Sequence, residues 1–269
     1  MTTRPGWRDR DDRPVDAPPV PGPDAPPFYG PIGDLQGSAY RRNAFAAGTE
    51  EELATLRRLL DLEPGVRVLD VGCGDARHLR ALAPTGVEGL GIDASPGLIA
   101  AGREAATREG VRVRLEVGDA RRLAVLLGER AGTFDVAWSL CQGALGTSPV
   151  TDPGVVAGMA GAVRPGGWVA VTCYHALFAA RHLAPGDAFD PIALVHHQVS
   201  EVRGRDDQRR SFDLWTAAYT AREAMRLLTD AGLEVASVRG VEPGAYGRRE
   251  AGEVGLDDPE LLVVARRPG

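Results

Sequence analysis

The residues best suited to chemistry are two glycines, Gly72 and Gly74, which follow an apolar segment and precede a helical pattern. Glycine adopts unusual backbone dihedrals and lets the main chain approach a ligand without a Cβ in between. At the carboxyl end of a strand in a parallel sheet, such a turn is typical of nucleotide binding. The sequence therefore predicts a nucleotide-type site at this turn.

Asp70 and Arg77 indicate which nucleotide the turn favours. A carboxylate just before the glycines would repel the diphosphate of a dinucleotide. A dinucleotide fingerprint also requires a third small residue where the helix packs closely on the strand, and Arg77 occupies that position. Both residues count against NAD, whereas the carboxylate suits a cationic ligand.

The turn resembles the first motif of the class I S-adenosylmethionine-dependent methyltransferases, in which an acidic residue precedes three alternating glycines. Asp70, Gly72 and Gly74 match this motif, with Cys73 between the glycines, and Ala76 replaces the third glycine. The resemblance implies S-adenosylmethionine, a sulfonium cation, as the cofactor. It covers about residues 40–267, because later segments match further motifs of the family in the expected order.

Three of these later segments concern the cofactor. Asp93, about 20 residues beyond the glycines, matches the acidic end of the second strand, which in the family binds both ribose hydroxyls. Asp119 matches the acid that accepts from the adenine amino group, and the loop after the fourth strand lies beside the methionine part in the family. The resemblance thus extends the expected cofactor contacts to Asp93, Ala94, Asp119, Ala120, Leu140 and Gln142.

Both aspartates also have simpler interpretations. An acid at the position of Asp93 occurs in NAD enzymes too, so it does not distinguish the two cofactors. An aspartate that follows a strand, as Asp119 does, is often only a helix cap. The order and spacing of the whole set favour the cofactor interpretation.

Histidines and aromatic residues are the candidates for the acceptor side. His175 directly follows the fifth strand, at the edge where ligands bind, and is the first candidate for a general base. A packed or solvated histidine is an equally good interpretation. His196 and His197 are neighbours in a predicted strand, so at most one of them faces a cleft. The expected substrate contacts are Tyr29, Tyr40, Tyr174, His196, His197 and Trp215.

Alternating strands and helices must position these residues. Five apolar segments alternate with helical patterns, which is typical of parallel βαβ units. Two later apolar segments complete a seven-stranded sheet, and two β-like runs around a polar turn predict a hairpin. The predicted fold is α/β: a doubly wound, mostly parallel Rossmann-like sheet with a β-hairpin insertion after the fifth strand. The segments are 66–71, 86–92, 111–117, 134–140 and 167–173, then 233–239 and 260–266, with the hairpin at 194–203 and 209–219.

The chain divides into a tail and one domain. Residues 1–27 hold eight of the twenty prolines and almost no large apolar residue, which predicts a disordered tail. Residues 28–269 form a single methyltransferase domain in this interpretation, in which the insertion at about 176–219 covers the acceptor site. Two capping boxes, Thr49 with Glu52 and Thr220 with Glu223, predict the starts of two helices.

Composition excludes several function classes. The 269 residues carry a net charge of −6 with no long basic run, which disfavours nucleic acid as a partner. No segment approaches the roughly 18 apolar residues of a membrane span. We expect a cytoplasmic monomer or homodimer.

The cysteines Cys73, Cys141 and Cys173 form no CxxC pair, which favours a reducing compartment. All three end a predicted strand, so together they could bind a soft ion. Free cysteine is also a common core residue, and we expect no metal site.

These residues predict an enzyme that transfers a methyl group from S-adenosylmethionine to an oxygen, nitrogen or carbon atom of a small organic molecule. Three alternatives stay open. They are an S-adenosylmethionine-binding protein with non-methylating chemistry such as a cyclisation, an NAD-dependent oxidoreductase, and a binding module without catalysis.

Overall fold

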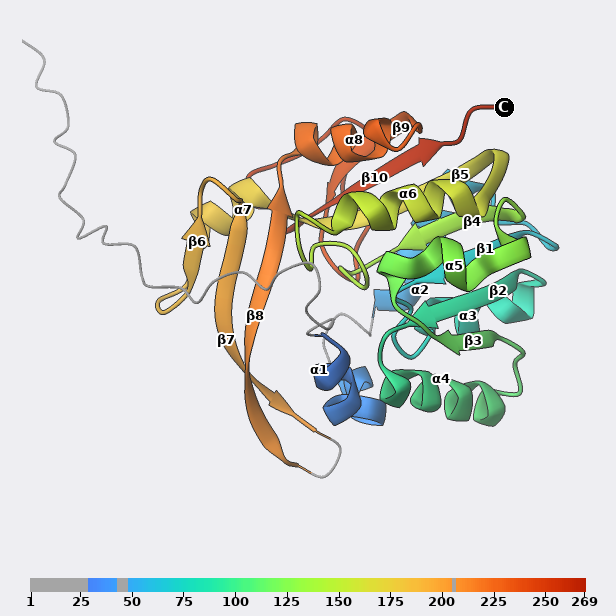
Figure 1. Ribbon diagram of the computed structural model, residues 1–269, viewed down its shortest axis with the longest axis horizontal. Helices are drawn as coiled ribbons and strands as arrows, with labels where there is room; N and C mark the ends of the chain where they lie inside the picture. The colour runs from blue at the N-terminus through green and yellow to red at the C-terminus, as the bar shows by residue number, and fades with distance from the viewer. Residues whose placement is uncertain (1–28, 43–47, 205–206) are drawn as a thin grey trace, which may run out of the picture.

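A computed structural model describes residues 29–42, 48–204 and 207–269. The predicted tail at 1–27 lies outside these residues. The described chain forms one continuous mixed sheet with helices on both faces (Figure 1).

The sheet has the predicted doubly wound core. Its parallel strands stand in the order β3-β2-β1-β4-β5. The connections between these parallel strands cross over the sheet and place helices on its two faces. An antiparallel pair completes the core, with β10 between β5 and β9. The strands are β1 (Arg67–Val71), β2 (Glu88–Asp93), β3 (Arg114–Val117), β4 (Phe134–Ser139), β5 (Val163–His175), β9 (Glu234–Val241) and β10 (Glu260–Arg266).

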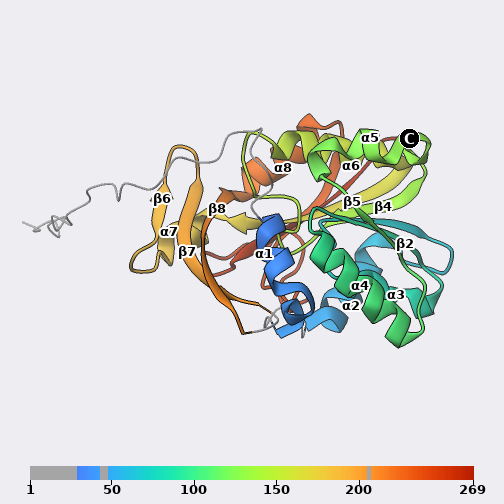
Figure 2. The ribbon, with the colours of Figure 1, turned by 60° about the horizontal axis from the view of Figure 1, so that its bottom comes forward.

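Two layers of helices bury the two faces of the sheet. Figure 2 shows α2, α3 and α4 on one face and α5, α6 and α8 on the other. Each layer packs apolar side chains against the sheet in its own core cluster. The helices are α2 (Thr49–Leu60), α3 (Arg77–Leu82), α4 (Pro96–Glu109), α5 (Leu123–Leu127), α6 (Asp152–Ala162) and α8 (Ala221–Asp230), with short 3-10 turns at Ala83–Thr85, Ala120–Arg122 and Gly128–Arg130.

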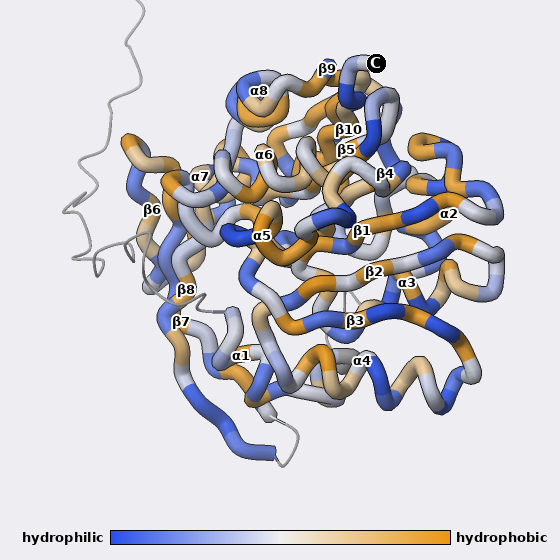
Figure 3. The backbone as a smooth tube through the Cα atoms, turned by 45° about the vertical axis from the view of Figure 1, so that its right-hand side comes forward, coloured by the Kyte–Doolittle hydropathy of each residue, from blue (hydrophilic) through white to orange (hydrophobic). Residues whose placement is uncertain are grey.

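The predicted hairpin is the antiparallel ribbon of β7 (Val195–Arg203) and β8 (Arg209–Tyr219). The end of β8 pairs in parallel with the end of β5, so the ribbon continues the sheet. Figure 3 shows hydrophobic residues along the central strands and a hydrophilic far end of the ribbon. The insertion also contains α7 (Ala176–Arg181) and β6 (Ala188–Asp190), which the sequence did not indicate.

A helical segment at the start of the described chain lies between the core and the ribbon. It consists of α1 (Tyr29–Gln36) and a 3-10 helix at Gly37–Arg42, and α1 packs against both α4 and β7 (Figure 1). Gly33 makes a close contact with α4 here, because a Cβ at this position would lie 2.7 Å from a methyl carbon of Leu98 and 2.8 Å from the Cβ of Ser95. This segment closes one side of the carboxyl edge of the sheet.

One of the two predicted capping boxes is correct. Thr220 accepts a hydrogen bond from the backbone N–H of Glu223, and the Glu223 carboxylate accepts one from the N–H of Thr220. The box at Thr49 and Glu52 is wrong, because Gly48 is the cap residue and no side chain caps this helix. Glu52 is instead fully buried against α3.

Candidate functional site

A cavity of about 450 Å³ opens at the carboxyl edge of the parallel strands. Its lining comes from the glycine turn after β1, from the end of β2, and from the loops after β3 and β4. The other side comes from α1 and its 3-10 helix, from the β7–β8 ribbon, and from the start of β10. This edge is where doubly wound sheets bind ligands, and the volume suits a nucleotide-sized one.

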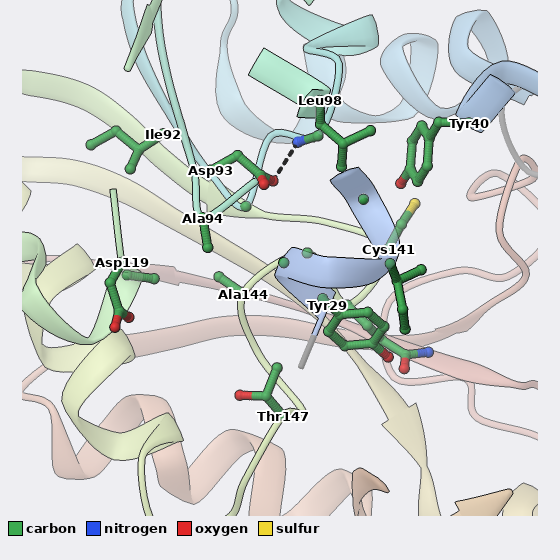
Figure 4. Close-up of a pocket in the computed structure, with 18 of the residues that line it drawn as sticks. Tyr29, Tyr40, Ile92, Asp93, Ala94, Leu98, Asp119, Cys141, Ala144 and Thr147 are labelled. Atoms are coloured by element: carbon green, nitrogen blue, oxygen red, sulfur yellow. Dashed lines mark hydrogen bonds between the residues drawn. The ribbon is translucent and has the colours of Figure 1, made fainter. Parts of the chain in front are cut away.

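Asp93 links the end of β2 to the glycine turn (Figure 4). Its carboxylate accepts hydrogen bonds from the backbone N–H of Gly74 and of Ser95, both at 2.8 Å. Burial raises the pKa of Asp93, although these two hydrogen bonds oppose the effect. Each carboxylate oxygen has a second lone pair, so Asp93 retains the capacity to accept hydrogen bonds from a ligand in the cavity. Ala94 lines the cavity beside it.

Asp119 and Ala120 line the cavity after β3, but the Asp119 carboxylate already has protein partners. It caps the following 3-10 turn through the N–H of Arg121 and pairs with the guanidinium of Arg121 at 2.6 Å. Burial raises the pKa of Asp119, but the hydrogen bonds from Arg121 outweigh it and leave the pKa below its usual value. Asp119 therefore acts as a cap of the 3-10 turn, as the simpler interpretation of the sequence suggested, and it lines the cavity as well.

The loop after β4 has an unusual backbone. Cys141 and Gln142 both adopt left-handed conformations, with φ of 51° and 56°, and both line the cavity. Side chains rarely tolerate this conformation, and such outliers concentrate at functional sites. The Cys141 thiol lies 3.1 Å from Nη2 of Arg77, and Gln142 donates a hydrogen bond to Glu260 at 3.0 Å.

Three of the expected cofactor contacts lie outside the cavity lining: Asp70, Cys73 and Leu140. All three are buried, and Cys73 and Leu140 belong to the core cluster under α2, α3 and α4. Burial raises the pKa of Asp70 to about 7, so this carboxyl is partly protonated at neutral pH. The structure thus places the acidic residue of the motif beneath the turn.

Tyr29 and Tyr40 do line the cavity, from α1 and the 3-10 helix after it (Figure 4). Tyr40 lies over the glycine turn, since a Cβ on Gly74 would be 3.4 Å from its ring. The ribbon contributes Ser200 and Leu214 to the lining, whereas the expected His196, His197 and Trp215 lie elsewhere on it.

The histidines pair with protein groups outside the cavity lining. His196 lies 3.0 Å from Asp187, and His197 lies 2.9 Å from Asp213 and packs on the ring of Trp215. Tyr174 packs between Phe178 and His196.

His175 is 1% exposed, and its Nδ1 lies 3.0 Å from the backbone oxygen of Asp258. The structure therefore brings the glycine turn, Asp93 and the two tyrosines together, but it does not bring His175 to them.

Glu260, at the start of β10, is a cavity residue that the sequence analysis missed. Burial raises its pKa to about 7. The signal was present in the sequence as a single carboxylate at the head of the apolar run Leu261–Ala265. Because β10 is antiparallel to β5, its first residue lies at the ligand edge.

In the described part of the chain, no group of three or more histidine, cysteine or acidic side chains is arranged to hold a metal ion. None of the helices described is both long and apolar enough to cross a lipid bilayer.

The chemistry of the cavity fits S-adenosylmethionine. The charged side chains in its lining are three carboxylates, Asp93, Asp119 and Glu260, and one guanidinium, Arg121, which pairs with Asp119. This excess of negative charge suits a sulfonium cation and would repel a diphosphate. Asp93 provides acceptors for hydroxyl groups at the rim.

Comparisons with known proteins show which family part of this chain resembles. Residues 68–167 match the family model of a methyltransferase domain. A ubiquinone biosynthesis O-methyltransferase from Bordetella avium is 37% identical over 106 residues, which cover 39% of this chain and 41% of that enzyme. The aligned region thus spans about two fifths of that curated relative.

Two solved structures share the fold over most of the chain. The methyltransferase CcbJ from Streptomyces caelestis has a TM-score of 0.70 at 19% identity, covering 88% of this chain and 98% of its own. The cyclase SpnF has a TM-score of 0.58 at 17% identity, covering 93% and 98%. Residues 68–167 are therefore a methyltransferase domain of the class I S-adenosylmethionine-dependent family, and S-adenosylmethionine is the methyl donor of this class.

Proposed function

We propose that the protein transfers a methyl group from S-adenosylmethionine to an oxygen, nitrogen or carbon atom of a small organic acceptor. The observation that supports this most directly is the composition of one cavity. The glycine turn, Asp93 and the loop after β4 line it on the cofactor side, and Tyr29, Ser200 and Leu214 line it on the other. A cofactor and a small acceptor can then share one enclosed space.

The residues of this chain mainly position the reactants. When bound, the cofactor supplies a methyl group activated on a positively charged sulfur. Asp93 accepts hydrogen bonds from the ribose hydroxyls, Asp119 and Ala120 contact the adenine, and the loop that contains Gln142 lies beside the methionine part. α1 and the β7–β8 ribbon exclude water from the acceptor side.

An oxygen acceptor is the first to test, because the Bordetella relative is named an O-methyltransferase. The likeness to SpnF favours a second candidate, an enzyme of this fold that catalyses a cyclisation instead. Turnover separates the two, since only methyl transfer converts S-adenosylmethionine to S-adenosylhomocysteine in proportion to the acceptor consumed.

Calorimetric titration with S-adenosylhomocysteine, with NADH as the comparison, tests the proposal. We expect micromolar binding of S-adenosylhomocysteine alone, and loss of that binding in Asp93→Ala. Binding of NADH instead would favour an NAD-dependent oxidoreductase. Sedimentation of the same sample distinguishes a monomer from a homodimer, which are the two states expected from the sequence.

A further inference from the structure

One carboxylate oxygen of Glu260 makes no hydrogen bond within the part of the chain that the structure describes. Its side chain is 2% exposed and lines the cavity. Oε1 accepts a hydrogen bond from Nε2 of Gln142 at 3.0 Å. Oε2 is buried and makes no hydrogen bond to the described residues by distance and angle. The hydroxyl of Thr172, like Gln142, lowers the pKa of this carboxyl against the effect of burial. A buried carboxylate oxygen without a hydrogen bond destabilises the folded protein. The site is therefore stabilised when this oxygen binds a proton or accepts a hydrogen bond from a ligand.

The position of Glu260 connects it to the cofactor side of the cavity. Gln142, its hydrogen-bond partner, lies in the left-handed turn after β4, the loop assigned above to the methionine part. In the sheet, Glu260 stands opposite Tyr174, near the end of β5. The carboxylate therefore lies at the carboxyl edge, next to the loop that faces the reactive end of the cofactor.

The charged groups around Glu260 have opposing effects on its pKa. Glu52 disfavours and Arg77 favours ionisation of Glu260, and these two groups pair with each other at 2.5 Å. The thiols and phenols that face it remain protonated at this pH, because burial raises the pKa of each of them. These groups are Tyr29, Cys141, Cys173, Tyr174 and Tyr246.

We propose that Glu260 is the general base that removes the proton from the nucleophilic atom of the acceptor, an O–H or N–H group. This inference rests on the methyl transfer proposed above. It also defines the class of acceptor: a neutral or cationic molecule rather than a carboxylate or a phosphate. The lining carboxylates outnumber Arg121, which already pairs with Asp119, so an acidic acceptor would meet net repulsion.

The step balances without another reactant. The O–H or N–H bond of the acceptor breaks and its proton passes to Oε2 of Glu260. The electron pair of the acceptor atom forms the bond to the methyl carbon, and the electron pair of the broken carbon–sulfur bond stays on sulfur. The products are the methylated acceptor, S-adenosylhomocysteine and a protonated Glu260, which releases its proton to water when the products leave.

The test compares wild type with Glu260→Gln, which keeps the size of the side chain and one oxygen that can accept from Gln142 but cannot take up a proton. Glu242→Gln is the matched control, because Glu242 is exposed and pairs with Arg248. The first measurement is calorimetric titration of each protein with S-adenosylhomocysteine. We expect all three affinities to agree within about twofold. A loss confined to Glu260→Gln would make this carboxylate a cofactor ligand and overturn the inference, whereas no binding by wild type would overturn the proposed function itself.

The second measurement needs no acceptor. Infrared difference spectra, wild type minus Glu260→Gln, follow the carboxyl stretch of the S-adenosylhomocysteine complex from about pH 5 to about pH 9. Asp70, whose pKa is also about 7, titrates in every variant and cancels in the difference spectrum. We expect a further carboxyl group to lose its proton near neutral pH in wild type and in Glu242→Gln, and this signal to be missing from Glu260→Gln. A Glu260 that stays ionised or stays protonated over this whole range would overturn the assignment.

The third measurement is turnover with a panel of phenols, alcohols and amines, including the matched pair of tyramine and 4-hydroxyphenylacetate. For any compound that wild type methylates, we expect Glu260→Gln to lower kcat by about 10²- to 10⁴-fold with little change in KM. The rise of wild-type kcat with pH should also disappear in this variant. Unchanged kcat, the same loss in His175→Gln instead, or a preference for the carboxylated member of the pair would contradict the inference.

Discussion

Gly72 and Gly143 pack backbone against backbone. A Cβ on Gly72 would lie 2.1 Å from the carbonyl carbon of Gly143, and a Cβ on Gly143 would lie 2.2 Å from the carbonyl oxygen of Gly72. The turn after β1 and the loop after β4 therefore hold each other in place at the cavity. Gly72 is required for this contact within the protein, in addition to any approach of a ligand.

This contact predicts a large effect of Gly72→Ala. The added methyl group meets main-chain atoms that cannot move without shifting a whole loop, and φ at position 72 is +76°. We expect a loss of at least about 3 kcal/mol in the free energy of unfolding, measured with urea. Gly65→Ala is the control, because Gly65 has a φ of +87° with open space around it, and it should lose only about 1 kcal/mol. Equal losses would show that backbone strain alone explains the effect.

Asp93→Ala tests the cofactor side of the site. In the proposed site Asp93 accepts two charge-assisted hydrogen bonds from the ribose hydroxyls, so its loss should weaken binding of S-adenosylhomocysteine about 100-fold or more, as measured by calorimetry. Asp135→Ala is a suitable control, since Asp135 accepts from the N–H of Arg67 and pairs with Arg164 outside the cavity lining. Thermal unfolding of both variants separates loss of binding from loss of the fold. Full affinity in Asp93→Ala would remove this residue from the site.

The sheet could be predicted from sequence because each strand is a short apolar run with its own boundaries. Segment 260–266 matches β10 residue for residue, and Arg209–Tyr219 matches β8. By contrast, α1 contains Gly30, Pro31 and Gly33, so its local pattern is weak and its packing on α4 and β7 supplies the stability.

The cofactor side of the site was predictable because motifs mark the turns that follow the parallel strands. Gly72 and Gly74 belong to the first motif and Asp93 to a later one, and the structure brings them together. Glu52 matches a capping box locally, yet tertiary partners on α3 determine its role. Glu260 becomes a cavity residue only through the antiparallel pairing of β10 with β5, which no local pattern encodes.

Glu52 predicts a test of stability. It is fully buried and accepts hydrogen bonds from Arg77 at 2.5 Å and from the N–H of Gly244 at 2.7 Å, and it lies 2.7 Å from Nε2 of His78. Glu52→Gln leaves the Arg77 cation without its buried counter-charge, so we expect a loss of about 3–5 kcal/mol in urea unfolding at neutral pH. Glu50→Gln, whose side chain is exposed, should change stability by less than about 0.5 kcal/mol. A similar small change in Glu52→Gln would show that the cluster contributes little.

The same cluster predicts acid sensitivity. Burial opposes ionisation of Glu52, but the hydrogen bonds from His78 and Arg77 outweigh it and lower its pKa from 4.5 to about 2. As the pH falls, Glu52 therefore takes up its proton in the unfolded chain before it does so in the folded protein. The stabilisation of the fold by ionised Glu52 is complete above about pH 4.5 and is lost as the pH falls towards 2. Wild type should therefore lose more stability than Glu52→Gln between these two pH values. Parallel losses in the two proteins would contradict the lowered pKa.

Glu260 predicts the opposite dependence on pH. Its pKa rises from 4.5 to about 7 on folding, so the folded protein retains a proton that the unfolded chain has already released. Stability associated with this group therefore falls as the pH rises from about 4.5 to about 7. Glu260→Gln lacks this titration, and relative to wild type it should gain on the order of 2–3 kcal/mol between about pH 5 and about pH 8. Urea unfolding at the two pH values measures the gain, with Glu242→Gln as the reference that should follow wild type. If Glu260→Gln follows wild type as well, the buried carboxyl does not titrate in this range, and a base poised near neutral pH is excluded at this position.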